Sequence, residues 1–496
     1  MPETPAPAQP RPFRRNFRNW LSWSGMVLAA SALFAFCFLF AIDLIAGHRN
    51  PYVGILAYLV APLFFALGIF LTFLGAIIRW RTRRRAVRAV EPLAIKIDLS
   101  RPRDRRILAL FGFGSVAFLF ITALGSYETY QYTETVGFCG QACHLPMTPQ
   151  FVAYQHTAHA SVDCVACHVG PGAAAYFKTK LNGVKQLYHT VRNDFDRPIR
   201  LAPDMRPAQA ICEQCHWPKK YVGNVDRTFQ HYLSDEKNTP FAVRLLLNVG
   251  GGDPSNGPVG GIHFHMNIAN KIEYIAADDE LLHIPWVRIT NPQGVTTEYR
   301  DPEFKDDLAK HQIRRMDCMD CHSRPAHKVH TPNEAVDLAL ATGRLDPKIP
   351  WVKSKVVAAL VKPYSSRSEA EQGIANDLRA SYPDPGQANS IVNVAQAIYR
   401  DNFFPEVKVD WRTYPDFVGH KNWDGCFRCH DGKHVTADGQ KSIKASDCKS
   451  CHLILAQGSG EALQQINANG YDFVHIDAPY SEFSCTDCHT GGPQKE

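Results

Sequence analysis

Cysteine is almost absent from this 496-residue sequence outside one repeated pattern, because only Cys37 of the 15 cysteines stands apart from it. Acidic residues are scarce near the N-terminus, where residues 1–125 hold 5 Asp and Glu against 16 Lys and Arg. Residues 126–496 reverse this balance, with 43 acidic and 38 basic residues. The N-terminal arginines flank apolar runs, so their charge favours a membrane anchor and argues against a nucleic-acid partner.

The other cysteines recur in pairs, and a histidine follows each pair. The spacing Cys-x-x-Cys-His occurs six times, and a further copy, the first in the chain, has one extra residue between its cysteines. Chance alone would give roughly 0.02 such pentapeptides in a chain of this composition. In chain order, motifs one to seven are Cys139–His144, Cys164–His168, Cys212–His216, Cys318–His322, Cys426–His430, Cys448–His452 and Cys485–His489.

This spacing suits the covalent attachment of haem. Two thiols three positions apart can both reach the vinyl groups of one porphyrin, while the adjacent imidazole binds the iron as proximal ligand. Structural zinc sites and disulfides are the alternatives, but neither needs a histidine directly after every second cysteine. We therefore predict haem c, seven groups or six. The predicted attachment residues are Cys139, Cys143, Cys164, Cys167, Cys212, Cys215, Cys318, Cys321, Cys426, Cys429, Cys448, Cys451, Cys485 and Cys488, and the proximal ligands are His144, His168, His216, His322, His430, His452 and His489.

Three apolar stretches are long enough to cross a bilayer, which takes about 20 residues at 1.5 Å each. They are Leu21–Ile42, Tyr52–Ile78 and Ile107–Gly125. No clear small-residue cleavage site follows the first stretch, so we do not expect residues 1–20 to be a removable signal peptide. Buried helices of a soluble protein are the alternative, and the distribution of charge argues against it.

Basic residues gather before the first stretch and between the second and third. Four arginines precede the first, and eleven Lys and Arg lie in the segment 79–106, whereas the loop between the first two has only Arg49. By the positive-inside rule both basic segments are cytoplasmic, which puts residues after Gly125 outside. Haem c is attached outside the cytoplasm, so an odd number of spans agrees with the motifs. We expect a multi-pass protein of a bacterial inner membrane with its haems in the periplasm.

The predicted fold is three transmembrane α-helices followed by a mainly helical and irregular periplasmic multihaem domain with a small β insertion. Alternating residues in Lys271–Arg300 predict a β-hairpin. Asn333 is expected to cap a helix through Leu345, and Ser368 a helix through Ala380. The expected segments are 1–125 (membrane anchor), 126–225 (haems of motifs one to three), 226–330 (β insertion and motif four), 331–415 (helical) and 416–496 (motifs five to seven).

Seven haems need seven further axial ligands unless one iron stays open to substrate. Fourteen histidines lie outside the motifs, so two histidines for most irons are feasible and would favour low potentials. The preferred candidates are His159, His263, His265, His327, His420, His434 and His475, with His156 and His330 less favoured and His189, His231, His283 and His311 weaker still. His263 and His265 are expected on one face of a strand. The sequence does not show which histidine serves which haem.

Several segments resemble the NapC/NirT/NrfH family of membrane-anchored multihaem cytochromes. They are Cys-Gly-Gln-Ala-Cys-His-Leu-Pro-Met (139–147), His-Thr-Ala-His-Ala-Ser-Val-Asp-Cys-Val-Ala-Cys-His (156–168) and Ile-Cys-Glu-Gln-Cys-His-Trp (211–217). The later segments 318–327 and 425–434 are similar to the longer, seven-haem inner-membrane members from metal-respiring bacteria.

The resemblance implies a quinol site where the first haem meets the membrane. In short family members a Met just after the first motif ligates that haem, and a Lys after the second motif helps to bind quinol. Met147 and Lys180 occupy those places. Two departures stand out: Met147 comes one position late, which leaves His144 as the alternative ligand, and the family's acidic residue falls on Leu187.

These observations predict a quinol dehydrogenase. Membrane quinol would give its electrons to the first haem, and the others would pass them to periplasmic c-type cytochromes or a terminal reductase. Two alternatives are a terminal reductase with an open haem, although no motif has Lys in place of His, and an electron-wiring subunit of a larger respiratory complex.

Overall fold

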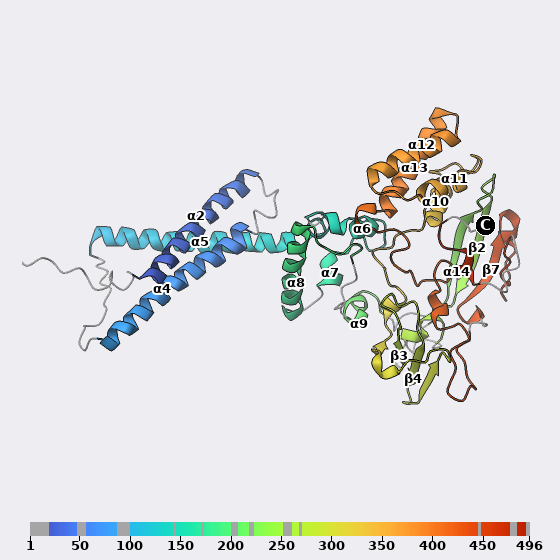
Figure 1. Ribbon diagram of the computed structural model, residues 1–496, viewed down its shortest axis with the longest axis horizontal. Helices are drawn as coiled ribbons and strands as arrows, with labels where there is room; N and C mark the ends of the chain where they lie inside the picture. Colours follow the sequence, from blue (N-terminus) through green and yellow to red (C-terminus); the bar gives the residue numbers. More distant parts are fainter. Residues whose placement is uncertain are drawn as a thin grey trace, which may run out of the picture. The chain divides into compact units, whose positions relative to one another are not determined.

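The chain divides into two compact units, which we call unit 1 (Met1–Ala142) and unit 2 (Cys143–Glu496) (Figure 1). The computed structural model describes residues 19–46, 56–86, 100–142, 144–169, 173–199, 207–217, 223–250, 260–266, 270–444, 448–476 and 484–492.

Unit 1 consists of long helices. They are α2 (Trp20–Ala46), the π-helical turn η1 (Leu56–Val60), α4 (Ala61–Ala86), α5 (Pro102–Glu134) and the π-helical turn η2 (Phe138–Ala142). By length and apolar composition, Trp20–Ile42 and Leu56–Thr82 could each cross a bilayer, in agreement with the first two predicted stretches.

Small residues allow α2 and α4 to approach closely. A Cβ atom added at Gly25 would lie 2.5 Å from the backbone nitrogen of Thr72, and one at Gly68 would lie 2.5 Å from that of Ala29. The hydroxyl of Ser22 also donates a hydrogen bond to the Thr72 carbonyl at 2.8 Å. Helices that associate in a bilayer commonly use such contacts, because apolar burial does not draw them together there.

The third predicted stretch, Ile107–Gly125, lies within α5, and several of its side chains are outside the described ones. The ring of Phe118 in α5 lies 5.1 Å from that of Phe36 in α2 and 4.8 Å from that of Phe65 in α4. The helix continues nine residues beyond the predicted boundary at 125. That α5 also crosses the membrane remains a proposal.

Unit 2 has little regular structure around the motifs, as predicted. Its helices are α6 (His144–Gln155), α7 (Cys164–His168), α8 (Ala173–Arg192), α9 (Ala208–Ile211), α10 (Pro332–Ala341), α11 (Val352–Leu360), α12 (Arg367–Ser381), α13 (Pro385–Asn402) and α14 (Cys485–Cys488). The 3-10 turns are η3 (Cys212–Gln214), η5 (Ile262–Met266), η6 (Leu308–Lys310), η7 (Cys318–Asp320), η8 (Pro405–Val407), η9 (Gly425–Arg428), η10 (Cys448–Ser450) and η11 (Gly460–Gln464). Motifs two to seven therefore begin on or beside one short helical turn each.

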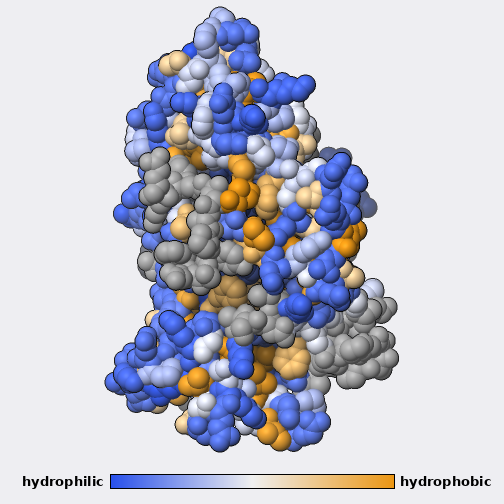
Figure 2. All heavy atoms as spheres, turned by 90° about the vertical axis from the view of Figure 1, so that its right-hand side faces the viewer, coloured by the Kyte–Doolittle hydropathy of each residue, from blue (hydrophilic) through white to orange (hydrophobic). Residues whose placement is uncertain are grey.

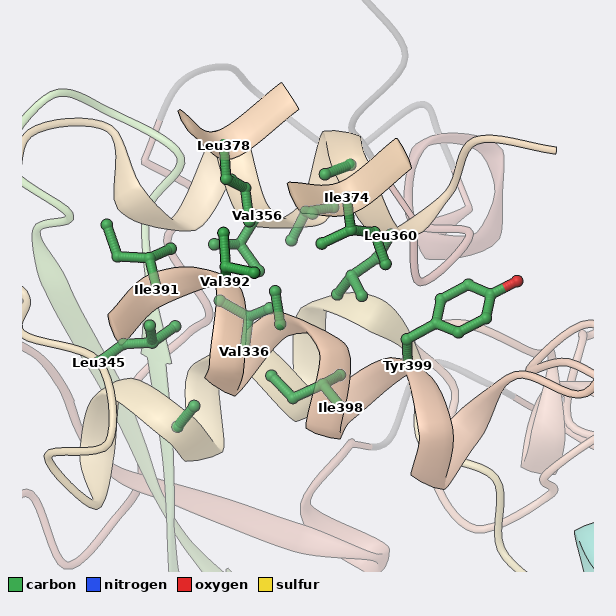
Figure 3. Packing of buried hydrophobic residues seen from close by; sticks show 14 of the residues in the cluster. Val336, Leu345, Val356, Leu360, Ile374, Leu378, Ile391, Val392, Ile398 and Tyr399 are labelled. Carbon is green, nitrogen blue, oxygen red and sulfur yellow. The ribbon is translucent and has the colours of Figure 1, made fainter. Parts of the chain in front are cut away.

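Helices α10 to α13 form a bundle with its own apolar core (Figure 3). The labelled core side chains converge from all four helices: Val336, Val356, Leu360, Ile374, Leu378, Ile391, Val392 and Ile398 are all buried. In two of the helices the cap lies two residues before the predicted one. Thr331 caps α10, where its hydroxyl accepts from the backbone of Glu334 at 3.2 Å and the Glu334 carboxylate accepts from the Thr331 backbone at 3.2 Å. Ser366 caps α12 in place of Ser368.

Unit 2 contains two antiparallel sheets, whereas the sequence predicted one small β insertion. One has the order β1-β2-β7, with β1 (Val225–Tyr232), β2 (Pro240–Leu247) and β7 (His452–Gly458). The other has the order β5-β4-β3-β6, with β3 (Lys271–Ile275), β4 (Trp286–Thr290), β5 (Thr296–Arg300) and β6 (Arg314–Arg315). The predicted hairpin is the β4–β5 pair, closed by an Asn291 side chain that accepts from Val295 N at 2.8 Å.

A buried ion pair joins the bundle to the first sheet. The Lys353 ammonium of α11 lies 2.6 Å from the Asp337 carboxylate of α10 and donates to the Tyr232 carbonyl in β1. Asp337 in turn accepts from the backbone nitrogen of Tyr232 at 3.2 Å. The bundle therefore belongs to the same unit as the motifs.

The face in Figure 2 is mostly hydrophilic, with apolar side chains in limited patches. The long helices of unit 1 differ, because they expose many large apolar side chains, such as Phe34, Phe70 and Phe113. This contrast is typical of a protein with a lipid-facing anchor and a part that lies in water. The five predicted segments remain a prediction.

Candidate haem sites

Most of the predicted attachment residues lie in the described part of the chain. Cys143 is outside it, and so are the side chains of His144 and Cys448. The described cysteines are all free of disulfides.

Five motif histidines each face one histidine from outside the motifs. The distances between ring centroids are 6.0 Å for His168 and His327, 6.1 Å for His216 and His159, 5.9 Å for His430 and His265, 6.3 Å for His452 and His420, and 5.9 Å for His489 and His475. Motifs two, three, five, six and seven thus have one candidate partner each.

The separation within these pairs is that of two imidazoles on opposite sides of one iron. A metal–nitrogen bond of about 2 Å places each ring centre about 3 Å from the metal, so two trans imidazoles have centroids about 6 Å apart. Two imidazoles on one tetrahedral zinc would be about 5 Å apart. The residues present therefore fit haem better than a zinc site.

The turn η5 carries two of the predicted ligands, and one of them, His263, lies near motif four. Burial lowers the pKa of His263, and the nearby His322 of motif four lowers it further. His265, two residues on, faces His430 of motif five. The expected strand is wrong here, because Ile262–Met266 is a 3-10 turn. On that turn the two imidazoles diverge toward different motifs.

Three of the partner histidines are oriented by backbone carbonyls through Nδ1. The accepting oxygens belong to Pro325 for His159 at 3.2 Å, Ile262 for His265 at 2.8 Å and Gln150 for His327 at 3.0 Å. A carbonyl at Nδ1 fixes the proton there and leaves Nε2 as the lone-pair nitrogen. This tautomer is the one that binds a metal through Nε2.

Burial favours the neutral form of eight of the candidate ligands. Burial lowers the pKa of both histidines in three pairs, which are His168 and His327, His322 and His263, and His452 and His420. It also lowers the pKa of His430 and of His489. For His327 and His489 the pKa falls to about 4. A neutral imidazole is the form that ligates a metal. The Nδ1 atoms of His420 and His452 are moreover buried without a hydrogen-bond partner among the described residues.

The other described histidines each face a carboxylate. The pairs are His156–Asp401 (3.8 Å), His189–Asp194 (2.9 Å), His231–Asp337 (3.3 Å), His283–Asp301 (3.9 Å), His311–Asp306 (3.7 Å), His330–Glu334 (3.6 Å) and His434–Asp431 (2.9 Å). His434, a predicted ligand, is fully engaged, because its Nε2 also contacts the Ile284 carbonyl at 2.6 Å. Its ring has no nitrogen left for iron, so we omit it from the ligand set.

Motif one has a different arrangement. His144 is the first residue of α6, and Met147 follows three positions later on the same helix. Because the side chain of His144 is outside the described ones, the choice between His144 and Met147 as the ligand of the first haem remains a prediction.

Lys180 lies on α8, whose apolar stripe is exposed. Leu181, Val184, Tyr188 and Val191 expose between 54% and 79% of their surface. Their spacing of three and four residues puts them on one face. At 100° per residue, Lys180 flanks one side of this face and Lys185 the other. The helix has no acidic residue.

Consecutive motifs in unit 2 touch one another. Cys212 and Cys318, of motifs three and four, are hydrogen bonded through their thiols. The Arg428 guanidinium of motif five donates to the Asp320 carbonyl of motif four at 2.7 Å. The thiols of motif three also lie close enough to Cys167 of motif two to raise its pKa beyond the effect of burial.

Motifs six and seven adjoin motif five. The ring of Phe427, inside motif five, lies 4.5 Å from that of His420, the partner of motif six. Thr486 of motif seven donates to the carboxylate of Asp424, just before motif five, at 2.9 Å. Motifs two to seven thus form a contiguous series.

Sequence reasoning missed the residues that hold motif seven. The carbonyls of Thr490 and Gly491 accept from the Trp411 indole at 3.0 Å and from the Asn333 backbone at 3.1 Å. These contacts join residues more than 75 positions apart. The signal available in the sequence was Thr490-Gly491-Gly492 directly after the motif, which is typical of a tight turn.

Two comparisons with known proteins agree with this geometry. A family model described as the N-terminal region of the NapC/NirT cytochrome c family matches residues 101–204. The cytochrome c-type protein ImcH of Geobacter sulfurreducens is 37% identical over 491 residues, which cover 95% of this chain and 95% of that protein. No solved structure matches. The chain therefore belongs to the NapC/NirT family of cytochromes c, as a membrane-anchored multihaem protein that binds haem c covalently and takes part in electron transfer.

Proposed function

We propose that the chain carries seven haems and that six of them have two histidine ligands. The proposed axial pairs are His168–His327, His216–His159, His322–His263, His430–His265, His452–His420 and His489–His475. The observation that carries this assignment is the centroid separation near 6 Å in five of the pairs. For the first haem we propose His144 or Met147.

We propose that the protein oxidises membrane quinol, menaquinol or ubiquinol, at the first haem. Motif one begins five residues after α5 ends, so this haem belongs at the membrane surface. The exposed apolar face of α8, flanked by Lys180 and Lys185, supports a site at which a lipid-soluble substrate arrives. Lys180 would hold a quinol oxygen, and the two protons would leave on the periplasmic side.

Three membrane spans are part of this proposal. The contacts of Phe118 with Phe36 and Phe65 support it, because they pack the apolar part of α5 against both other long helices. Three spans with a cytoplasmic N-terminus put unit 2 in the periplasm of an inner membrane.

Haem supplies reversible one-electron chemistry at iron, and the protein sets its ligands and surroundings. The contacts between motifs two, three, four and five, and from five to six and seven, support a continuous path through these six motifs. Two histidines at each of six irons would leave no open site there for a small substrate. This disfavours a terminal reductase and favours delivery to a periplasmic cytochrome or reductase.

The test is to mix the purified, oxidised protein with a reduced quinol analogue in detergent and to follow the Soret and α bands. The proposal expects both bands to shift to their reduced positions. Bands that stay oxidised with the quinol, yet shift fully with dithionite, would rule out quinol oxidation while leaving the haem assignment intact.

A further inference from the structure

Arg324 is a partly buried cation, and one nitrogen of its guanidinium is buried without a hydrogen bond in the described part of the chain. Its Nε donates to the His327 carbonyl at 2.9 Å, and its guanidinium carbon lies 3.8 Å from the centre of the Tyr414 ring. Its Nη2 is buried and has no hydrogen-bond partner among the described residues. Burial lowers the pKa of Arg324 to about 10, and the Tyr414 hydroxyl offsets only part of that effect.

Arg428, in the same unit, is an arginine of similar setting whose guanidinium is fully hydrogen bonded. It lies over the Phe417 ring at 3.4 Å, as Arg324 lies over Tyr414. All three of its guanidinium nitrogens, however, donate to backbone carbonyls, those of Gly425, Leu281 and Asp320, at 2.7 to 2.9 Å. Arg324 has only one such bond.

An enclosed guanidinium without a counter-ion is costly, since a buried charge needs a partner of opposite sign. In the described part of the chain no carboxylate forms an ion pair with Arg324. The partner that fits is therefore an anion that the polypeptide does not provide. A planar, bidentate donor beside the axial pair His168–His327 matches a carboxylate of the porphyrin bound there.

We propose that Arg324 binds a propionate carboxylate of the second haem, the one held between His168 and His327, and thereby raises its reduction potential. The inference rests on the proposed axial pair. A fixed positive charge favours the state with one more electron, so it stabilises the reduced haem. The same guanidinium orients His327 through that residue's carbonyl, which couples the charge to the ligand.

The experiment is a potentiometric titration of the intact, purified protein, followed in the α band, for wild type, Arg324→Met and Arg324→Lys. Arg379→Met, on the exposed face of the bundle, removes one positive charge elsewhere as a control. We expect Arg324→Met to lower the midpoint potential of one haem, Arg324→Lys to lower it less, and the control to change nothing. The haem content and low-spin spectra should stay as in wild type.

The outcomes separate this inference from the ligand assignment. Unchanged potentials in an Arg324→Met protein with full haem content would overturn it, even if thermal stability fell. If Arg324→Met does not fold, Arg324→Gln, which keeps a donor but no charge, takes its place with the same expected shift. If His327→Ala leaves every haem low-spin, the axial pair itself is wrong, and that result stands apart from the potentials of the Arg324 variants.

Discussion

Histidines in this protein divide into two classes by what their ring nitrogens contact. Among those that face a motif histidine, His159, His265 and His327 bind a backbone carbonyl through Nδ1, and His420 has no hydrogen-bond partner at Nδ1 within the described residues. Seven other described histidines outside the motifs face a carboxylate. This difference decides which side chains have Nε2 to offer to iron.

Replacement of His420 and of His434 should separate the two classes. We expect His420→Ala to leave one haem five-coordinate, with a high-spin signal in resonance Raman or electron paramagnetic resonance spectra. His434→Ala should keep all spectra low-spin and instead lower the stability by about 1–3 kcal/mol, because two buried hydrogen bonds are lost. A high-spin signal from the His434 variant would restore it as a ligand.

Lys180 has a matched control in Lys185 on the other side of the α8 stripe. A charge-assisted hydrogen bond is worth about 1.5–3 kcal/mol, so Lys180→Met should slow reduction by the quinol analogue at least about tenfold. Lys185→Met should not. Equal rates in wild type and Lys180→Met, measured by stopped flow at equal haem content, would exclude Lys180 from the quinol site.

At the scale of elements, the bundle of α10 to α13 shows how local sequence signals set a structure. Thr331, Ser366 and Asp384 each cap a helix, and Pro332 and Pro385 occupy first helical positions. The bundle also contacts the residues after motif seven. Thr331, which caps α10, lies beside Gly491, and a Cβ atom added at Gly491 would be 2.6 Å from the Thr331 side chain. Stability of α10 is therefore linked to the position of that motif.

Acid should destabilise this end of α10. Burial alone would raise the pKa of Glu334, but the hydrogen bond from His330 and the charge of Lys328 lower it to about 2, against an ordinary value of 4.5. A carboxylate whose pKa is lower in the folded protein than in the unfolded protein stabilises the fold at a pH above its unfolded pKa. This stabilisation is lost as the pH falls through the folded pKa. Between pH 4.5 and about 2 we expect the unfolding midpoint to fall more steeply in wild type than in Glu334→Gln.

Circular dichroism of the intact protein at several pH values measures this difference, and Glu461→Gln, exposed on η11, is the control. Identical slopes for wild type and Glu334→Gln would show that Glu334 does not sense acid in the folded protein. Thr331→Ala should cost about 1 kcal/mol at neutral pH, because the cap is lost.

The sequence predicted those elements whose signals are local. Apolar length gave α2 and α4, alternation gave the β4–β5 hairpin, and capping residues placed the starts of α10 and α12 to within two positions, although α10 ends at Ala341 and not at the predicted Leu345. Strand β7 could not be predicted as a partner of β2, because 204 residues separate Leu247 from His452. A pairing over that distance leaves no periodic signal.

The ligand pairs were hidden for the same reason. His159 faces His216, past the intervening motif two, and His265 faces His430 across 165 residues. The sequence contains enough histidines to provide a second ligand for each haem, but tertiary packing decides which histidine faces which motif. The strand expected for His263 and His265 was wrong because Ile262–Met266 is a 3-10 turn, on which the two imidazoles lie near different motif histidines, His322 and His430.

For the whole molecule, the proposed function gives a direction of transfer. Electrons would enter where motif one follows α5 and leave from the part of unit 2 that carries motifs six and seven. The position of the anchor and the order of the motifs along the chain agree with this direction. Mass spectrometry of the intact protein should find seven haems; six would mean that the irregular motif one carries none.

The central claim is that electrons pass from quinol in the bilayer to an acceptor in water. The direct measurement uses proteoliposomes loaded with reduced quinol and an external oxidised cytochrome c that cannot cross the membrane. We predict reduction of that cytochrome by the wild-type protein, and none when Cys164 and Cys167 are both replaced by Ser, which removes the second haem from the path. External reduction that continues at the wild-type rate in the double variant, or none with the intact protein, would contradict the account.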